Sequence, residues 1–252
     1  MTFADVFLTT PFAHRGLHDL LPGHPENSRA AFLAAIDAGY GIELDIQSSA
    51  DDAAMVFHDD DLDRLTAATG PVNRHTARAL GAMALRGGAE GIPTLAEVCA
   101  LVAGQVPLLI EIKDQDGRLG PDIGPLERAV AGVLRGYGGA VAVMSFNPHS
   151  VAAMADLLPD VPRGLTTCAF DPQEWRLPAE ICAHLTTIAD FLSVGASFIS
   201  HDHNDLANPR VGELKSRGAG ILCWTIRTPE QEARARRIAH TITFEGYAAP
   251  LA

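Results

Sequence analysis

The sequence predicts an α/β fold in which eight parallel strands alternate with helices to form a closed (β/α)8 TIM barrel. Two observations support this prediction. Short apolar runs alternate with helix-like segments along most of the chain. Polar residues that follow several of these runs would all lie at the carboxyl ends of the strands, where such barrels place their sites. The chain of 252 residues, 47% of them hydrophobic, is long enough to form one domain, residues 1–252.

Eight apolar runs are predicted as the parallel strands: 12–15, 41–47, 108–113, 142–146, 163–167, 191–195, 221–226 and 241–245. Helices are predicted from Asn27 or Ser28 to Gly39, from Thr94 to about Ala103, and over 121–137, 148–158, 178–185, 209–217 and 229–237. The polar segment HDHND (201–205) between two of these elements is predicted as a solvated loop rather than a metal cluster.

The second strand is followed by a hairpin-like excursion instead of a helix. The chain from Asp45 to His58 is too short for a helical crossover, which needs roughly a dozen residues besides the strand. The short run Met55–His58 would therefore fold back over the same end of the sheet. We predict a small insertion, about residues 48–91, over the carboxyl-end mouth of the barrel.

Composition excludes several partners. The formal net charge of −12 makes nucleic acid and anionic membrane surfaces poor partners, and an anionic substrate would need a local positive site. Four scattered cysteines without a CxxC pair suit reduced thiols. The first residues do not resemble an export signal, and no run approaches the roughly 18 apolar residues of a membrane span. We expect a cytoplasmic protein with no stable membrane association; its oligomeric state stays open.

Two carboxylates share one face of the second strand. Side chains two positions apart on a strand point to the same side, so Glu43 and Asp45 would lie together. Glu111 ends another apolar run in the same way. Two acids on the same face of an apolar strand are unusual unless a cation lies between them. The alternative is an edge strand whose polar face is exposed to water. Three carboxylates without cysteine favour Mg²⁺ or Ca²⁺ over zinc.

Basic residues lie at the ends of the first and third predicted strands. Arg15 and Lys113 would flank the cation, which suits a phosphate group because all three positive charges neutralise phosphate oxygens. His14 and His58 could then act as general base and general acid, since histidine ordinarily titrates near neutrality. A single histidine is more often a surface or core residue, but two at the rim that holds the acids favour a catalytic pair.

Short motifs connect these residues in a fixed order: AHRG (Ala13–Gly16), PENS (Pro25–Ser28), ELD (Glu43–Asp45), FHDDDLDRLT (Phe57–Thr66), GIPTLAE (Gly91–Glu97), EIK (Glu111–Lys113), SF (Ser145–Phe146) and WT (Trp224–Thr225). In this order and spacing they resemble the glycerophosphodiester phosphodiesterase family. The resemblance spans nearly the whole chain, and the combination is much more specific than any one motif.

The resemblance implies a phosphodiesterase-type barrel that hydrolyses a small glycerophosphodiester to glycerol 3-phosphate and an alcohol. It implies that the metal ligands are Glu43, Asp45 and Glu111, the acid–base pair His14 and His58, and the phosphate contacts Arg15 and Lys113. Trp224 would form an apolar wall for the glycerol or the alcohol; the alternative is an ordinary core aromatic. The resemblance further implies attack by the neighbouring glycerol hydroxyl through a cyclic phosphate. Direct attack by water stays open, as does the choice between Mg²⁺ and Ca²⁺.

The chain departs from the family pattern at two places. Arg227 stands where the family usually has Asn, and Phe244 and Glu245 stand where it usually has a Thr-Asp pair. Both changes leave the expected reaction unaltered and concern the alcohol half of the substrate. Arg227 is expected to disfavour a choline head group, because it would add a positive contact.

Three other functions compete with this interpretation. A lysophospholipase D-type phosphodiesterase shares the chemistry, although no amphipathic or basic surface helix supports it. A Schiff-base aldolase could use a lysine at the end of a buried strand, but Glu111 beside Lys113 would keep the amine charged. A barrel that only binds phosphate would be favoured by a missing histidine or acid, and none is missing.

Overall fold

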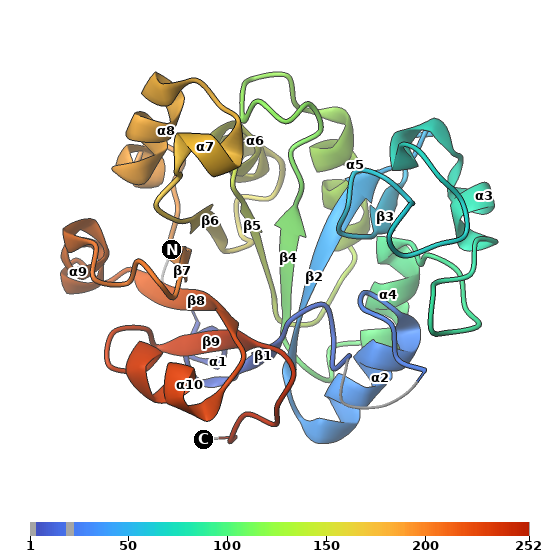
Figure 1. Ribbon diagram of the computed structural model, residues 1–252, viewed down its shortest axis with the longest axis horizontal. Helices are drawn as coiled ribbons and strands as arrows, with labels where there is room; N and C mark the ends of the chain where they lie inside the picture. Colours follow the sequence, from blue (N-terminus) through green and yellow to red (C-terminus); the bar gives the residue numbers. More distant parts are fainter. Residues whose placement is uncertain (1–3, 19–22, 252) are drawn as a thin grey trace.

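The structure is a computed structural model that describes residues 4–18 and 23–251. Within these residues, eight parallel strands close into a barrel (Figure 1). In order around it they are β1 (Phe12–Ala13), β2 (Gly41–Ser48), β4 (Leu108–Ile112), β5 (Val141–Ser145), β6 (Arg163–Thr167), β7 (Phe198–Asp202), β8 (Gly220–Ile226) and β9 (Thr241–Phe244). Strand β1 closes the ring by pairing with both β2 and β9. The predicted TIM barrel is confirmed.

Helices connect the strands. The longer ones are α2 (Arg29–Ala38), α4 (Leu95–Val102), α5 (Pro125–Leu134), α6 (Pro148–Leu157), α8 (Ala179–Thr186), α9 (Pro209–Ser216) and α10 (Pro229–Ala235). Shorter elements are α1 (Val6–Thr9), α3 (Ala77–Gly81), α7 (Pro172–Trp175) and 3-10 turns at Val72–Arg74 and Ala189–Phe191. In α2, Ser28 is the cap: its hydroxyl accepts a hydrogen bond from the Ala31 backbone, and Gly39 ends the helix in the left-handed region. Across the described ranges, no helix combines the length and apolar character needed to cross a bilayer.

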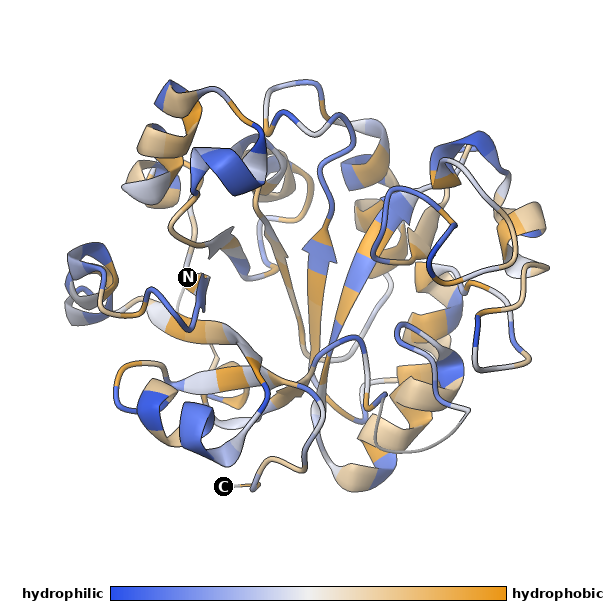
Figure 2. Cartoon of the chain, in the orientation of Figure 1, coloured by the Kyte–Doolittle hydropathy of each residue, from blue (hydrophilic) through white to orange (hydrophobic). Residues whose placement is uncertain are grey.

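Alternate residues of each strand face two different cores. The core inside the barrel contains Phe7, Phe12, Leu109, Ala142, Met144, Phe198 and Leu222. Leu44 and Ile46 of β2 belong instead to the core between the barrel and its helices. Glu43 and Asp45 alternate with these outward-facing residues and therefore point into the barrel. Figure 2 shows the result as hydrophilic bands on the otherwise hydrophobic strands β2 and β4.

Gly164 of β6 lies opposite Phe198 of β7. A methyl group at position 164 would lie 2.4 Å from the Phe198 ring, which is fully buried and has no room to withdraw. We expect Gly164→Ala to lower the free energy of unfolding by about 1–3 kcal/mol. Gly132→Ala, at an open position of α5, is the matched control and should raise stability by up to about 1 kcal/mol. Denaturant titration measures both, and equal stabilities would contradict this packing.

The excursion after β2 is a hairpin, as predicted. Strand β3 (Ala54–Val56) runs antiparallel to β2, with Ile46 opposite Val56. The following residues, which include α3, lie at one side of the barrel (Figure 1). They pack around a hydrophobic cluster of their own that contains Phe57 and Leu62. The Phe57 backbone N–H donates to the Asp45 carbonyl at 3.0 Å. This contact brings His58, the next residue, to the carboxyl end of β2.

The sixth strand of the barrel, β7, lies later in the chain than the sequence predicted. Residues 191–195 are not a strand, because Phe191 and Val194 are buried while Leu192 is 68% exposed, a spacing that fits a helical turn. Strand β7 instead includes the first two residues of HDHND, so the prediction of a solvated loop was wrong for this part. His201 is fully buried within the strand.

Candidate active site

Three buried carboxylates meet inside the barrel. Glu43 and Asp45 come from β2 and Glu111 from β4, where Asp45 and Glu111 lie opposite each other in the parallel pair. One oxygen from each residue lies within 4.8 Å of the others. The strand register therefore produces the acidic cluster that the residue spacing predicted.

Asp45 is the most heavily paired of the three acids. Its Oδ1 lies 2.8 Å from the Lys113 ammonium, and its Oδ2 accepts a hydrogen bond of 2.9 Å from the Asn27 amide. Burial by itself would raise the pKa of Asp45, but the positive charge of Lys113, together with His58 and Arg15, holds it well below its usual value. Lys113 also lies 2.5 Å from Glu111, and these carboxylates keep its pKa above the ordinary value despite burial. Asp45 and Lys113 are thus both charged at neutral pH.

Glu43 is compensated much less. Its carboxylate accepts a hydrogen bond of 3.0 Å from the Arg15 backbone N–H. Burial and the nearby charges of Asp45 and Glu111 raise its pKa well above the ordinary value. A buried acid that resists ionisation beside two further carboxylates is a site that a cation would relieve. The oxygen-only donor set fits a hard divalent cation, as the sequence analysis expected.

His14 lies in the turn after β1. Its Nδ1 is 2.5 Å from an oxygen of Glu245, and its Nε2 is 4.0 Å from an oxygen of Glu43. Burial lowers the pKa of His14 to about 4, even though the hydrogen bond to Glu245 opposes the shift. The imidazole is therefore neutral at neutral pH.

His58 reaches the site from the hairpin insertion. Its side chain is 31% exposed, and its Nδ1 lies 2.7 Å from Asp59 Oδ1. Arg64 binds the other oxygen of Asp59 at 2.7 Å. Burial would raise the pKa of Asp59, but the hydrogen bonds from His58 and Arg64 lower it below its usual value. Asp59 is thus a fixed negative charge beside the His58 ring.

All eight residues that the sequence analysis singled out line one cavity of about 180 Å³: His14, Arg15, Glu43, Asp45, His58, Glu111, Lys113 and Trp224. Arg15 is fixed by Glu26 at 2.7 Å and lies 3.4 Å from Asp45. Trp224 faces Phe146, which also lines the cavity, in an edge arrangement, and its indole N–H donates to the Ser200 carbonyl. The structure therefore brings residues from four strand ends and the insertion to a single pocket.

Sequence reasoning missed the residues that hold this set in place. Asn27 was considered only as a helix cap, whereas its fully buried amide binds Asp45 and Ser28 makes the cap. Asp59 and Glu245, which bind the two histidines, were not identified as their partners. The sequence contained one indication of this role of Asn27. Asn27 and Ser28 are adjacent candidate caps, and because one helix needs only one cap, the other residue is available for a different contact.

Arg227 lines the same cavity as the predicted site residues. Its Nε donates to Glu245 Oε1 at 2.7 Å, so its charge is paired with a carboxylate. The expected effect of Arg227 on a choline head group stays a prediction. The two departures from the family pattern, at positions 227 and 245, are in direct contact.

A second cavity of about 510 Å³ adjoins the first. The two share His58, Glu111, Lys113 and Phe146 in their walls. Beyond these residues, the lining of the larger cavity includes Leu119 and Trp175 as well as three aspartates, Asp59, Asp60 and Asp114, and its exposed surface is more apolar than that of the first cavity. A ligand bound at the carboxylates could therefore extend from the small polar cavity into the larger one.

Known sequences match most of the chain. Residues 14–241 match the Glycerophosphoryl diester phosphodiesterase family. A glycerophosphodiester phosphodiesterase of Caldanaerobacter subterraneus subsp. tengcongensis is 33% identical over 186 residues, covering 70% of this chain and 74% of that protein. The Bacillus subtilis (strain 168) protein YhdW is 28% identical over 233 residues, covering 88% of each chain.

The fold is shared with solved structures. A phosphodiesterase of Oleispira antarctica, OLEI02445, in complex with the product sn-glycerol-3-phosphate, superposes with a TM-score of 0.73 at 24% identity. The match covers 94% of this chain and 93% of that one. At this identity the likeness concerns the fold.

Proposed function

The chain belongs to the glycerophosphoryl diester phosphodiesterase family, and we propose that it hydrolyses glycerophosphodiesters to glycerol 3-phosphate and an alcohol, using a divalent cation and two histidines. The convergence of His14, His58 and three buried carboxylates on one cavity is the observation that carries this proposal. The Oleispira antarctica relative in complex with sn-glycerol-3-phosphate supports the same product here.

Charge balance supports the need for a cation. With all three carboxylates ionised, the cavity would hold one more negative charge than the two fixed cations, Arg15 and Lys113, can balance, and a phosphodiester anion would add to that excess. Mg²⁺ or Ca²⁺ held by Glu43, Asp45 and Glu111 would reverse that excess. When bound, such an ion neutralises charge on the phosphate oxygens.

The chain's own groups would bind the phosphate and move the protons. Lys113 and Arg15 would contact phosphate oxygens, since both lie beside Asp45 and line the cavity. One of the two histidines would take the proton of the attacking hydroxyl, and the other would protonate the leaving alcohol. The protonated Lys113, paired with two carboxylates, argues against a Schiff-base aldolase.

The larger cavity would receive the alcohol. Trp175 packs on Phe146 with ring centroids 4.8 Å apart, and both line this cavity. Because an aromatic wall contributes through buried apolar area, we expect Trp175→Ala to raise the KM for glycerophosphocholine about tenfold, or roughly 1.4 kcal/mol. Inhibition by glycerol 3-phosphate, which would occupy the smaller cavity, is the control and should be unchanged. An equal weakening of both would place the alcohol elsewhere.

A panel of glycerophosphodiesters tests the proposal directly. Purified protein should release glycerol 3-phosphate, lose activity in EDTA and recover it when Mg²⁺ or Ca²⁺ is added back. Activity that persists without metal would remove the cation from the proposal. Phosphate binding without hydrolysis of any diester would indicate a barrel that only binds.

A further inference from the structure

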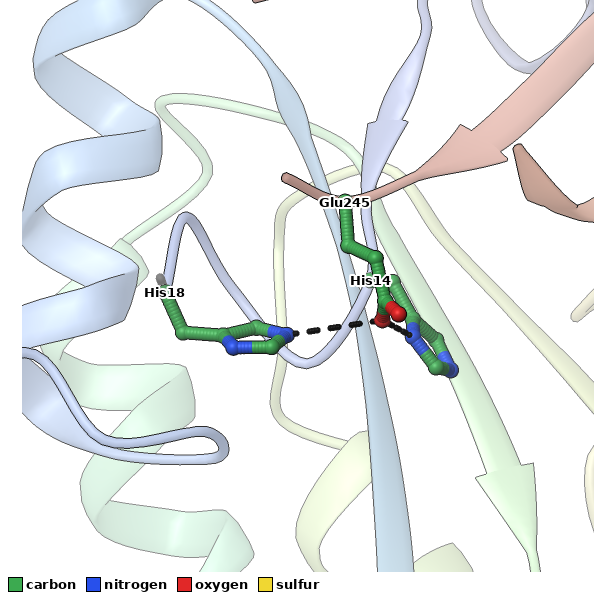
Figure 3. A group of neighbouring side chains, drawn as sticks. All are labelled: His14, His18 and Glu245. Atoms are coloured by element: carbon green, nitrogen blue, oxygen red, sulfur yellow. Dashed lines mark hydrogen bonds and ion pairs between the residues drawn. The ribbon is translucent and has the colours of Figure 1, made fainter. Parts of the chain in front are cut away.

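Glu245 is a carboxylate in an enclosed position. It follows β9 directly, its backbone N–H donates to the Ile226 carbonyl at 3.0 Å, and its side chain is only 15% exposed. Figure 3 shows it between two imidazoles, with His14 on one side and His18 on the other. A partly buried carboxylate needs partners for both oxygens.

The two oxygens of Glu245 have different partners. Oε2 lies 2.5 Å from His14 Nδ1 and 3.6 Å from His18 Nε2, while Oε1 accepts a hydrogen bond of 2.7 Å from Arg227 Nε. Arg227 is anchored in turn, because its backbone N–H donates to the Gln231 side chain at 2.7 Å. The carboxylate is therefore held from one side by Arg227 and presented to His14 from the other.

We infer that Arg227 and Glu245 form a positioning pair that fixes the ring orientation and tautomer of His14. An ionised carboxylate only accepts hydrogen bonds, so the His14 nitrogen that faces it must carry a proton. In the neutral ring the lone pair then lies on Nε2, the nitrogen directed toward Glu43 and the cavity. Only the catalytic consequence of this inference rests on the proposed function, because the tautomer of His14 is a property of the metal-free protein and can be measured there.

The isosteric variant Glu245→Gln makes the sharpest test. An amide has one accepting oxygen, but His14 N–H and Arg227 N–H both require an acceptor. If the oxygen serves Arg227, the amide NH₂ faces His14 and forces the opposite tautomer. We expect kcat to fall about tenfold to hundredfold with little change in KM.

Four further variants separate a positioning role from a packing role. Glu245→Asp keeps the charge and should recover most of the rate that Glu245→Ala loses. Arg227→Ala should cost less than Glu245→Ala, and the double variant should lose no more than Glu245→Ala alone, because both act through one histidine. The proposed positioning pair would be contradicted if the rate losses of Arg227→Ala and Glu245→Ala were additive in the double variant, or if Glu245→Asp recovered none of the rate.

Nitrogen NMR of the histidine rings gives a readout that does not depend on activity. In the metal-free protein His14, assigned by comparison with His14→Gln, should show the Nδ1–H tautomer, and Glu245→Gln should shift it toward Nε2–H. An inactive wild-type protein with this shift would refute the proposed function and leave the pair standing. An unchanged tautomer would overturn the pair. Stoichiometric Co²⁺ binding that requires His18 and Glu245 would also overturn it, since the same side chains could then be metal ligands.

Discussion

His58→Ala and His14→Ala are each expected to lower turnover by about a hundredfold or more while the barrel remains folded. His58 is the cleaner case. Its ring is partly exposed, and its partner Asp59 keeps two hydrogen bonds to Arg64. Replacement of His58 by alanine therefore leaves the Asp59 carboxylate paired. The loss should therefore appear in the rate rather than in stability.

The matched control for His58 is His184 on α8. It is likewise bound to an aspartate, Asp190, at 2.7 Å, but it does not line the two cavities of the proposed site. His184→Ala should keep the wild-type rate. Steady-state kinetics with glycerophosphodiester substrate and circular dichroism measure both effects, and a near-wild-type rate in either His14→Ala or His58→Ala would remove that histidine from the acid–base pair.

Glu43→Gln is expected to have the second large effect, a loss of metal affinity. The change removes one of three oxygen ligands while keeping the side-chain size, so affinity for Mg²⁺ and Ca²⁺ should fall by at least about a hundredfold. The metal-free protein should be as stable as the wild type or more so, because ionised Glu43 is poorly compensated in its buried position. Calorimetric titration and thermal unfolding with and without metal measure these two opposite effects.

Glu232→Gln is the control for this experiment. Glu232 is also buried, but it is paired with Arg236 and the Tyr247 hydroxyl outside the cavity. Its replacement should weaken those contacts and leave metal affinity unchanged. Unaltered affinity in Glu43→Gln would instead exclude Glu43 from the ligand set.

The sequence predicted the parts of the site that depend on strand periodicity. Glu43 and Asp45 are two residues apart, so any strand through them places both on one face, and the barrel topology then brings Glu111 beside them. Their positions were predictable because local geometry and a single topological rule determine them.

Residues whose role depends on long-range contacts were not predictable in this way. Glu245 lies 231 positions from His14 in the chain, and no local pattern links them. The carboxylate partner of Arg227, 18 positions away, could not be identified from the sequence either. Strand β7 was misplaced for a related reason: Phe191 and Val194 resemble a strand in composition but are spaced as a helical turn.

The barrel closes where the first strand meets the last. The His14 backbone N–H donates to the Phe244 carbonyl at 2.9 Å, and β1 is only two residues long. A growing polypeptide thus carries His14 from early in its synthesis but acquires the support for that ring only after about 230 further residues have left the ribosome. A chain that lacks the final strand and the residue after it would therefore contain all eight of the proposed site residues and still lack the carboxylate partner of His14.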